Sequence, residues 1–210
     1  GVWLPRADDR TDLLAFAERA QRLDEAAVVR LRARGPDRVT AWAATGLDVL
    51  ASRVVAGRLR PEDMTVGADG LVRAVGGADE SGYADPGYPM DSAWRGALPP
   101  SAGFVHLDDV PAQVLLELAR DGGQLAREHG GGQGPPVSLL DQEVLSVSAG
   151  GQTVGVPMRC VFALTAMAFL PDSVDADEVV RVRALPNWLR IDARYGSVYR
   201  RRGAPSVVLR

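Results

Sequence analysis

The sequence has 210 residues, with 27 acidic and 24 basic side chains and a formal net charge of −3. A chain of this length can fold as one substantial domain or two small lobes without a disulfide or a structural metal, and its single cysteine, Cys160, excludes an intrachain disulfide. No apolar run reaches the roughly 18 residues of a membrane span and the first residues lack a signal-peptide layout, so we expect a soluble, cytoplasmic protein with no membrane partner.

All 24 basic residues are arginines, and the chain contains no lysine. The sequence therefore excludes the enzymes that need an amine, such as those with a lysine Schiff base, a P-loop lysine or a serine–lysine dyad. The composition, rich in Ala, Gly, Arg, Val and Pro, is typical of a GC-rich genome. Part of the arginine content therefore reflects codon usage and does not by itself indicate function.

The first third predicts one helix followed by three antiparallel strands. Apolar residues recur at helical spacing from 11 to 22, with Thr11 as a candidate N-cap. Residues 26–55 contain three short segments rich in Val, Leu and Trp, separated by turn residues. A short helix is expected around 69–74, and the sequence shows no internal repeat.

Residues 76–103, which we call the aromatic strap, have neither helical nor strand periodicity. This stretch is dense in Gly, Pro, Asp and Ser and exceeds the usual loop length, so it is either a functional loop or a linker between lobes. Tyr83, Tyr88 and Trp94 favour a strap packed on its own domain, with a partner-binding loop as the alternative.

The second half predicts two further helices, a hairpin and a pair of C-terminal strands. A helix over 109–121 has Asp108 or Asp109 as N-cap and Gly122–Gly123 as its end. A short helix then leads to a hairpin that turns at Gly150–Gly151. An almost wholly apolar helix is expected over 159–169.

The charges divide unevenly along the chain. Residues 1–180 carry 26 acidic side chains against 16 arginines, whereas residues 181–210 carry eight arginines against Asp192 alone. The binding candidates of this C-terminal arginine segment are Arg181, Arg183, Arg190, Arg194, Tyr199, Arg200, Arg201 and Arg202. Alternation places Arg181, Arg183, Arg190 and Arg194 on one sheet face, a pattern typical of surfaces that meet negative charge.

Three interpretations of this segment remain open. It is an ordinary solvent face that pairs with the protein's own acidic residues, a surface for an acidic protein partner or self-association, or a nucleic-acid surface that combines arginines with an aromatic ring. No helix-turn-helix, RNA-recognition or zinc-finger motif favours the last.

Catalytic groups are few. Cys160 is a weak candidate nucleophile if it lies at a helix N-terminus beside Arg159, with His106 or His129 as base. A lone cysteine among apolar neighbours is more often a small buried residue. One cysteine and two histidines with no ligand spacing argue against zinc, and we expect no metal and no cofactor.

The sequence therefore predicts an α+β protein with antiparallel sheet segments from both halves, packed by about three main helices. It is one domain over 1–210, or two lobes, 1–75 and 104–210, joined by the aromatic strap. We expect a non-enzymatic interaction or regulatory module that acts through the C-terminal arginine segment or the strap. The alternatives are a nucleic-acid-binding protein and a small enzyme that uses Cys160.

Overall fold

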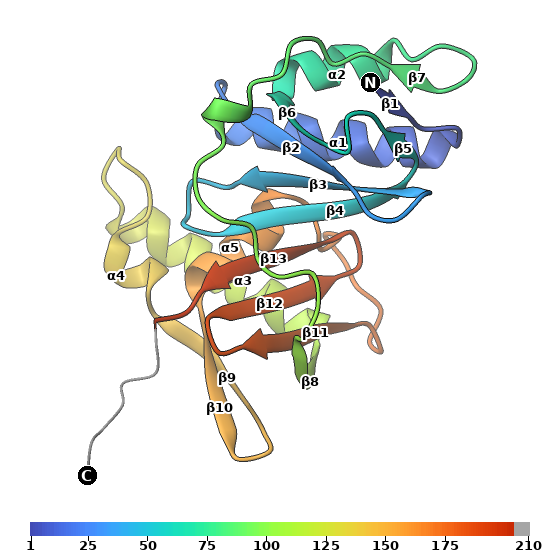
Figure 1. Cartoon of the computed structure of the whole chain (residues 1–210). Helices are drawn as coiled ribbons and strands as arrows, with labels where there is room; N and C mark the ends of the chain where they lie inside the picture. Colours follow the sequence, from blue (N-terminus) through green and yellow to red (C-terminus); the bar gives the residue numbers. More distant parts are fainter. Residues whose placement is uncertain (204–210) are drawn as a thin grey trace. The chain divides into compact units, whose positions relative to one another are not determined.

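The computed structural model describes residues 1–203 and divides them into two compact units. Unit 1 comprises Gly1–Gly46 and Leu50–Ala97, and unit 2 comprises Leu47–Val49 and the chain from Leu98 onward. Both units combine helices with antiparallel strands (Figure 1), so the fold is α+β, as the sequence predicts. The boundary at 97/98 assigns most of the aromatic strap to unit 1.

Unit 1 is built on four antiparallel strands in the order β6-β2-β3-β4. These strands are β2 (Val28–Ala33), β3 (Arg38–Ala44), β4 (Leu50–Ala56) and β6 (Asp63–Gly67). Helices α1 (Ala7–Leu23) and α2 (Ala68–Gly76) pack together on one face of this sheet (Figure 1). A smaller sheet joins β5 (Arg58–Leu59), β1 (Val2–Trp3) and β7 (Tyr83–Ala84) in that order.

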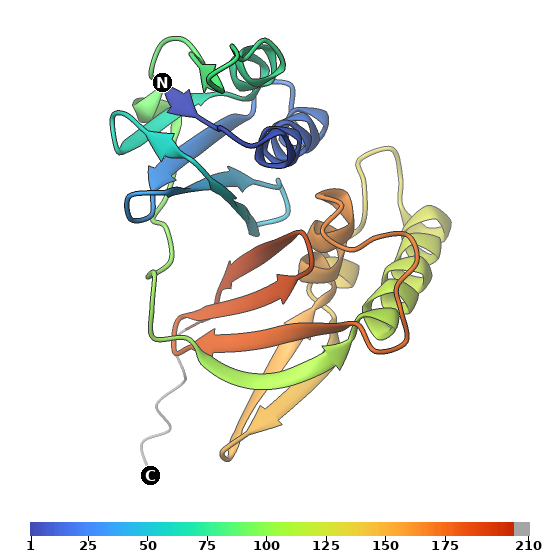
Figure 2. The ribbon, with the colours of Figure 1, turned by 90° about the vertical axis from the view of Figure 1, so that its right-hand side faces the viewer.

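Unit 2 has the corresponding order β13-β12-β11-β8. Its strands are β8 (Val105–Pro111), β11 (Val179–Leu185), β12 (Trp188–Ala193) and β13 (Gly196–Arg201). Helices α3 (Ala112–His129) and α5 (Met158–Ala166) pack against each other. The short α4 (Val137–Leu140) precedes a hairpin of β9 (Glu143–Ala149) and β10 (Gln152–Pro157), which forms a two-stranded sheet of its own (Figure 2).

Alternation along the strands explains the two cores. In β2, Val29 and Leu31 are fully buried while Arg30 and Arg32 lie on the opposite face. In β11, Val180 and Val182 are buried while Arg181 and Arg183 lie opposite. Successive strand residues point to opposite faces of the sheet, so this pattern buries one apolar face per unit.

Three helices begin directly at the end of a strand, with no loop between them. The junctions are β6–α2, β8–α3 and β10–α5. The first helical residue of each is buried, as is the residue three positions later: Ala68 and Leu71, Ala112 and Leu115, and Met158 and Val161. This recurring strand–helix element is not visible as a sequence repeat because only burial, not residue identity, recurs.

Several predicted boundaries are wrong. Helix α1 begins at Ala7, and Thr11 lies inside it with its hydroxyl donating to the Ala7 carbonyl at 3.1 Å. Asp108 and Asp109 lie on β8 and do not cap α3, because the strand continues to Pro111. Helix α3 also passes through the predicted stop at Gly122–Gly123 and ends at His129.

Packing explains the position of Gly122. A Cβ at this residue would lie 2.6 Å from Cε and 2.8 Å from Sδ of Met158, so glycine allows α3 and α5 to approach closely. Other predictions are confirmed, including the hairpin turn at Gly150–Gly151 and the three strands within 26–55. Within residues 1–203, no helix is both long and apolar enough to cross a membrane.

Candidate binding surfaces

The C-terminal arginine segment contributes to both faces of the unit 2 sheet. Arg181, Arg183, Arg190 and Arg201 share the face opposite the core, and we call these four residues the basic sheet face. Strand register determines this grouping, because Arg183 lies directly opposite Arg190, which lies opposite Tyr199. Four arginines are therefore brought together from three strands.

Three other predicted binding arginines of the segment lie away from this face. The turn between β12 and β13 falls at Arg194–Tyr195, because Ala193 pairs with Gly196. Arg194 therefore leaves the face and forms an ion pair with Glu178 at 3.3 Å. Arg200 lies opposite Leu189 and points to the other side of the sheet, where it meets the Asp48 carboxylate at 3.3 Å. Arg202 follows β13 and donates to the Leu185 carbonyl at 3.0 Å.

The protein's own acidic groups neutralise part of the basic sheet face. Asp192 lies 2.7 Å from the Arg190 guanidinium and 3.3 Å from that of Arg183. Asp109 of β8 lies 3.9 Å from Arg181, whose side chain is 58% exposed. Four guanidiniums therefore face two carboxylates, which leaves a surplus of two positive charges.

Aromatic rings hold the central arginine of this face. The Arg190 guanidinium lies 5.4 Å from the ring centre of Tyr199 and 5.6 Å from that of Phe104, and the two rings contact each other edge to face. Arg201 lies 5.3 Å from the Trp188 ring centre. Cation–π contacts of this kind orient a guanidinium without using all of its N–H donors.

The aromatic strap packs on unit 1 and covers one edge of its sheet. The Met90 amide donates to the Thr65 carbonyl at 2.7 Å, and the Thr65 amide donates to Asp91 at 2.7 Å. Residues 90–91, at the start of the 3₁₀ turn η1 (Asp91–Ala93), thus satisfy backbone groups of the edge strand β6. An uncovered edge strand would invite pairing with another chain.

The three aromatic residues of the strap have different environments. Tyr83 packs against Trp3, with ring centres 4.9 Å apart, and Trp94 lies 5.9 Å from the Arg30 guanidinium. Tyr88 is 92% exposed, in a turn where the Asp85 carboxylate accepts a hydrogen bond from the Gly87 amide. Two of the three predicted binding residues are therefore used in internal packing.

Cys160 and the two histidines do not form a catalytic arrangement. Cys160 is 1% exposed on α5, and burial raises the pKa of its thiol to about 12. A nucleophilic cysteine needs access and a lowered pKa. His106 lies on β8 with Nε2 3.4 Å from Asp109, and His129 is the exposed last residue of α3. Among residues 1–203 no group of Cys, His, Asp and Glu could hold a metal ion.

Arg159, beside Cys160, has a structural environment. It is 8% exposed and donates to the Asp141 carboxylate and, at 2.7 Å, to the Leu47 carbonyl. Arg200 lies 3.9 Å from the same carboxylate. The guanidinium predicted to activate a thiol therefore holds the segment Leu47–Val49 within unit 2.

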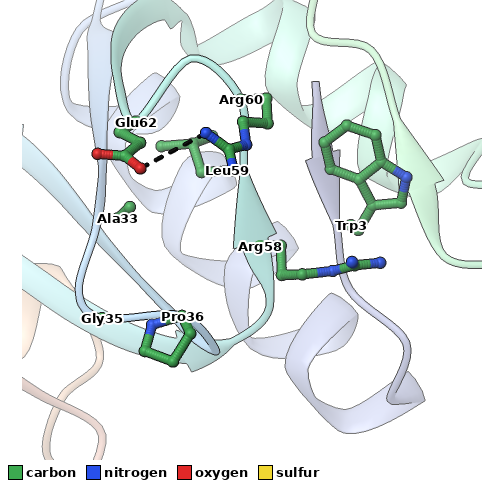
Figure 3. A pocket seen from close by; sticks show the side chains of 8 residues that line it. All are labelled: Trp3, Ala33, Gly35, Pro36, Arg58, Leu59, Arg60 and Glu62. Atoms are coloured by element: carbon green, nitrogen blue, oxygen red, sulfur yellow. Dashed lines mark ion pairs between the residues drawn. The ribbon is translucent and has the colours of Figure 1, made fainter.

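Sequence reasoning did not find a pocket of about 290 Å³ in unit 1. The β1–β5 pair, the end of β2 and the turns after β2 and β5 contribute the lining residues (Figure 3), which are Trp3, Ala33, Gly35, Pro36, Arg58, Leu59, Arg60 and Glu62. These residues are dispersed over sixty positions and carry no motif. The sequence offers one signal for such a site, a tryptophan and an arginine whose side chains strand pairing brings together.

The fold resembles bacterial DNA polymerase sliding clamps. The clamp of Caulobacter crescentus aligns with a TM-score of 0.57 and 18% identity, covering 96% of this chain and 67% of the clamp. A DNA polymerase III beta subunit of Eubacterium rectale gives 0.59 and 10% identity, covering 95% and 65%. The Helicobacter pylori beta clamp, solved with a DNA ligase peptide, gives 0.55 and 9% identity, covering 96% and 68%.

These likenesses concern the fold, and the chain spans about two thirds of the length of the clamps. No curated protein matches the sequence. Residues 1–96 match the family described as Domain of unknown function (DUF8010). Residues 99–205, just over half of the sequence, match the family described as Domain of unknown function (DUF8185), and the chain belongs to this family.

Proposed function

We propose that this chain is a non-enzymatic protein-interaction module that docks an acidic segment of a partner protein, or of a second copy of itself, on the basic sheet face. The observation that carries the proposal is the placement of Arg190 against the contacting rings of Phe104 and Tyr199, with Arg181, Arg183 and Arg201 around it. Ring contacts orient the guanidiniums of Arg190 and Arg201, and Asp192 orients that of Arg183, before a partner binds. Preorganised arginines lose little conformational entropy when they bind a carboxylate.

The surplus of charge supports an acidic partner. Asp192 and Asp109 offset two of the four positive charges. The longest of the three ion pairs, Arg181–Asp109 at 3.9 Å, has an arginine side chain that is more than half exposed. Exposed ion pairs of this kind contribute about 0–1 kcal/mol, so a partner carboxylate can replace Asp109 at little cost. The likeness to sliding clamps, one of which is solved with a bound peptide, is compatible with an interaction module.

Helix surfaces do not favour the nucleic-acid alternative. Helices α1 and α3 each carry one more acidic than basic side chain, with histidines taken as neutral, and α2 is balanced. A surface that follows a phosphate backbone requires a larger basic excess than the basic sheet face provides.

The test compares the wild type with the double variant Arg181→Glu/Arg201→Glu. Its matched control is Arg127→Glu, which reverses an exposed arginine on α3. Each immobilised protein is exposed to a nuclease-treated extract of the source organism, and sedimentation velocity reports self-association. We expect a defined set of proteins, or the chain's own oligomer, to be kept by wild type and control and lost by the double variant.

Equal retention by all three proteins would contradict the proposal. A second arm measures fluorescence anisotropy of labelled single- and double-stranded DNA from low to moderate salt. DNA binding that falls steeply with salt and disappears in the double variant would assign the face to nucleic acid instead.

A further inference from the structure

The pocket of unit 1 has one wall made of Arg58 and the Trp3 ring, and Tyr83 supports that ring from outside the pocket. Trp3 of β1 pairs with Arg58 of β5 on one side and with Tyr83 of β7 on the other. The Arg58 guanidinium lies 6.0 Å from the Trp3 ring centre, and Trp3 and Tyr83 are inclined by 44°. Figure 3 shows Arg58 extending alongside the indole. Strand pairing thus holds a cation and an aromatic surface side by side.

The other side of the pocket has an apolar base and a charged rim. Leu59 is 3% exposed, and Ala33 and Pro36 add apolar surface next to it. Arg60 and Glu62 form the rim, with a distance of 3.5 Å between their charged atoms and side chains 75% and 74% exposed. Such an exposed pair contributes about 0–1 kcal/mol, so Arg60 can turn to a ligand with little loss.

Charge and size define the ligand. Two guanidiniums and one carboxylate line the pocket, so one net positive charge faces the ligand. The volume of about 290 Å³ lies just below the range of roughly 300–1,000 Å³ that is typical of small-molecule sites. This accommodates one carboxylate and one apolar group but not a dinucleotide cofactor. The exposed rim leaves both ends of a ligand free to continue along the surface, as the ends of a peptide do.

We propose that this pocket binds a peptide segment of a partner protein in which an acidic residue stands next to an aliphatic or aromatic residue. Arg58 and Arg60 bind the carboxylate, and Ala33 and Pro36 contact the apolar side chain. The site lies in unit 1 and uses no residue of the basic sheet face, so the two proposals stand or fall separately.

The experiment measures fluorescence polarisation of short labelled peptides, acetylated and amidated at their ends. The probe contains aspartate followed by leucine between glycine–serine flanks. One analogue replaces the aspartate with asparagine, and a second replaces the leucine with serine. We expect wild type to bind the probe and to lose about tenfold or more in affinity for each analogue, since both the charge-assisted hydrogen bonds and the apolar contact are needed.

Two variants test the pocket from different sides. Arg58→Gln/Arg60→Gln removes the charges, and Ala33→Leu fills the apolar side while keeping both arginines. We expect each of these variants to bind the probe with an affinity lower by about tenfold or more. The matched control is Arg73→Gln on α2, an arginine of the same unit with 73% exposure, which should bind the probe as wild type does. Thermal melts establish whether each variant is folded. If Ala33→Leu does not fold, the binding of the probe by Arg58→Gln/Arg60→Gln tests the proposal alone.

Three results would overturn the proposal. If wild type does not bind the probe, the pocket is not a peptide-binding site. If the probe and its serine analogue bind equally, the affinity comes from charge attraction alone and the apolar contact does not contribute. Free 4-methylpentanoate binding as tightly as the peptide would make a small carboxylate, not a peptide, the occupant.

Discussion

Arg190 donates a hydrogen bond from Nε to the carboxylate of Asp192 over 2.7 Å, two residues further along β12. The same carboxylate lies 3.3 Å from Arg183 and accepts a hydrogen bond from the hydroxyl of Ser197. Asp192 is the one acidic residue of the C-terminal arginine segment. Its position between two arginines makes it the counter-ion around which the basic sheet face is organised.

Replacing Asp192 with asparagine should therefore destabilise the protein by about 2 kcal/mol, because hydrogen bonds to charged groups contribute roughly 1.5–3 kcal/mol and two half-buried guanidiniums lose their counter-ion. Urea unfolding measures the change. Asp121→Asn on the exposed side of α3 is the control and should leave the midpoint unchanged. Equal stability of the two variants would show that Asp192 does not organise the face.

Adjacent glycines of α3 should respond oppositely to substitution. Gly122→Leu forces a side chain into Met158 and Phe162, and overpacking of this kind typically costs about 1–3 kcal/mol. At Gly123 a Cβ meets only the Arg127 guanidinium at 3.6 Å, so Gly123→Ala should stabilise the helix by about 0.5–1 kcal/mol. Thermal unfolding of both variants checks the prediction, which fails if the two shifts have the same sign.

Cys160 should react with iodoacetamide at neutral pH only when the protein is unfolded. Burial raises its pKa from 9.0 to about 12, so the folded protein keeps the thiol protonated. Intact-mass spectrometry with and without urea measures the labelling. Rapid labelling of the native protein would contradict the buried position.

The same pKa shift has a consequence for stability. Above about pH 9 the unfolded chain releases the thiol proton while the folded protein keeps it until about pH 12, so stability is full below pH 9 and falls as pH rises through this window. Unfolding curves of wild type and Cys160→Ala over this range should diverge, with a shallower decline for the variant.

Asp63 should contribute to acid unfolding of unit 1. Hydrogen bonds from Arg30, both of 2.8 Å, lower the pKa of this carboxyl below its usual value of 3.8, and Arg32 adds to the effect. A lowered pKa in the folded state stabilises the protein above the unfolded value, and this contribution disappears as pH falls through the folded value.

Below about pH 4, the free energy of unfolding of Asp63→Asn should depend less on pH than that of wild type. Unfolding measurements across the acid range test this. Asp63 is 39% exposed, so solvent screening keeps the difference small. The control is Asp37→Asn, which replaces an exposed acid in the turn after β2.

The sequence predicts correctly those features that depend on residues close together in the chain. The alternation of Val180 and Val182 with Arg181 and Arg183 indicates a half-buried strand, and Gly150–Gly151 indicates a hairpin turn, because both features reflect local backbone geometry. The α+β class follows from such local patterns, and so does the exclusion of lysine chemistry.

Predictions that required knowledge of distant neighbours were wrong or absent. The sequence predicts that Gly122 ends a helix, but it lies within α3. Glycine is needed there because Met158, thirty-six residues later, occupies the space that a side chain would take. The sequence predicts Arg200 as a binding residue with the other arginines, but it lies opposite Leu189 on the core-facing side of the sheet, towards Asp48.

The sequence alone determined the α+β class, the surplus of arginine at the C-terminal end and the poverty of catalytic groups, since these depend on composition and on contacts between near neighbours. Tertiary structure alone decided which arginines share a face, which acids neutralise them, and that Trp3, Arg58 and Arg60 surround a pocket with Leu59. Strand register and helix packing bring these groups together over long sequence separations, and local residue patterns do not encode such contacts.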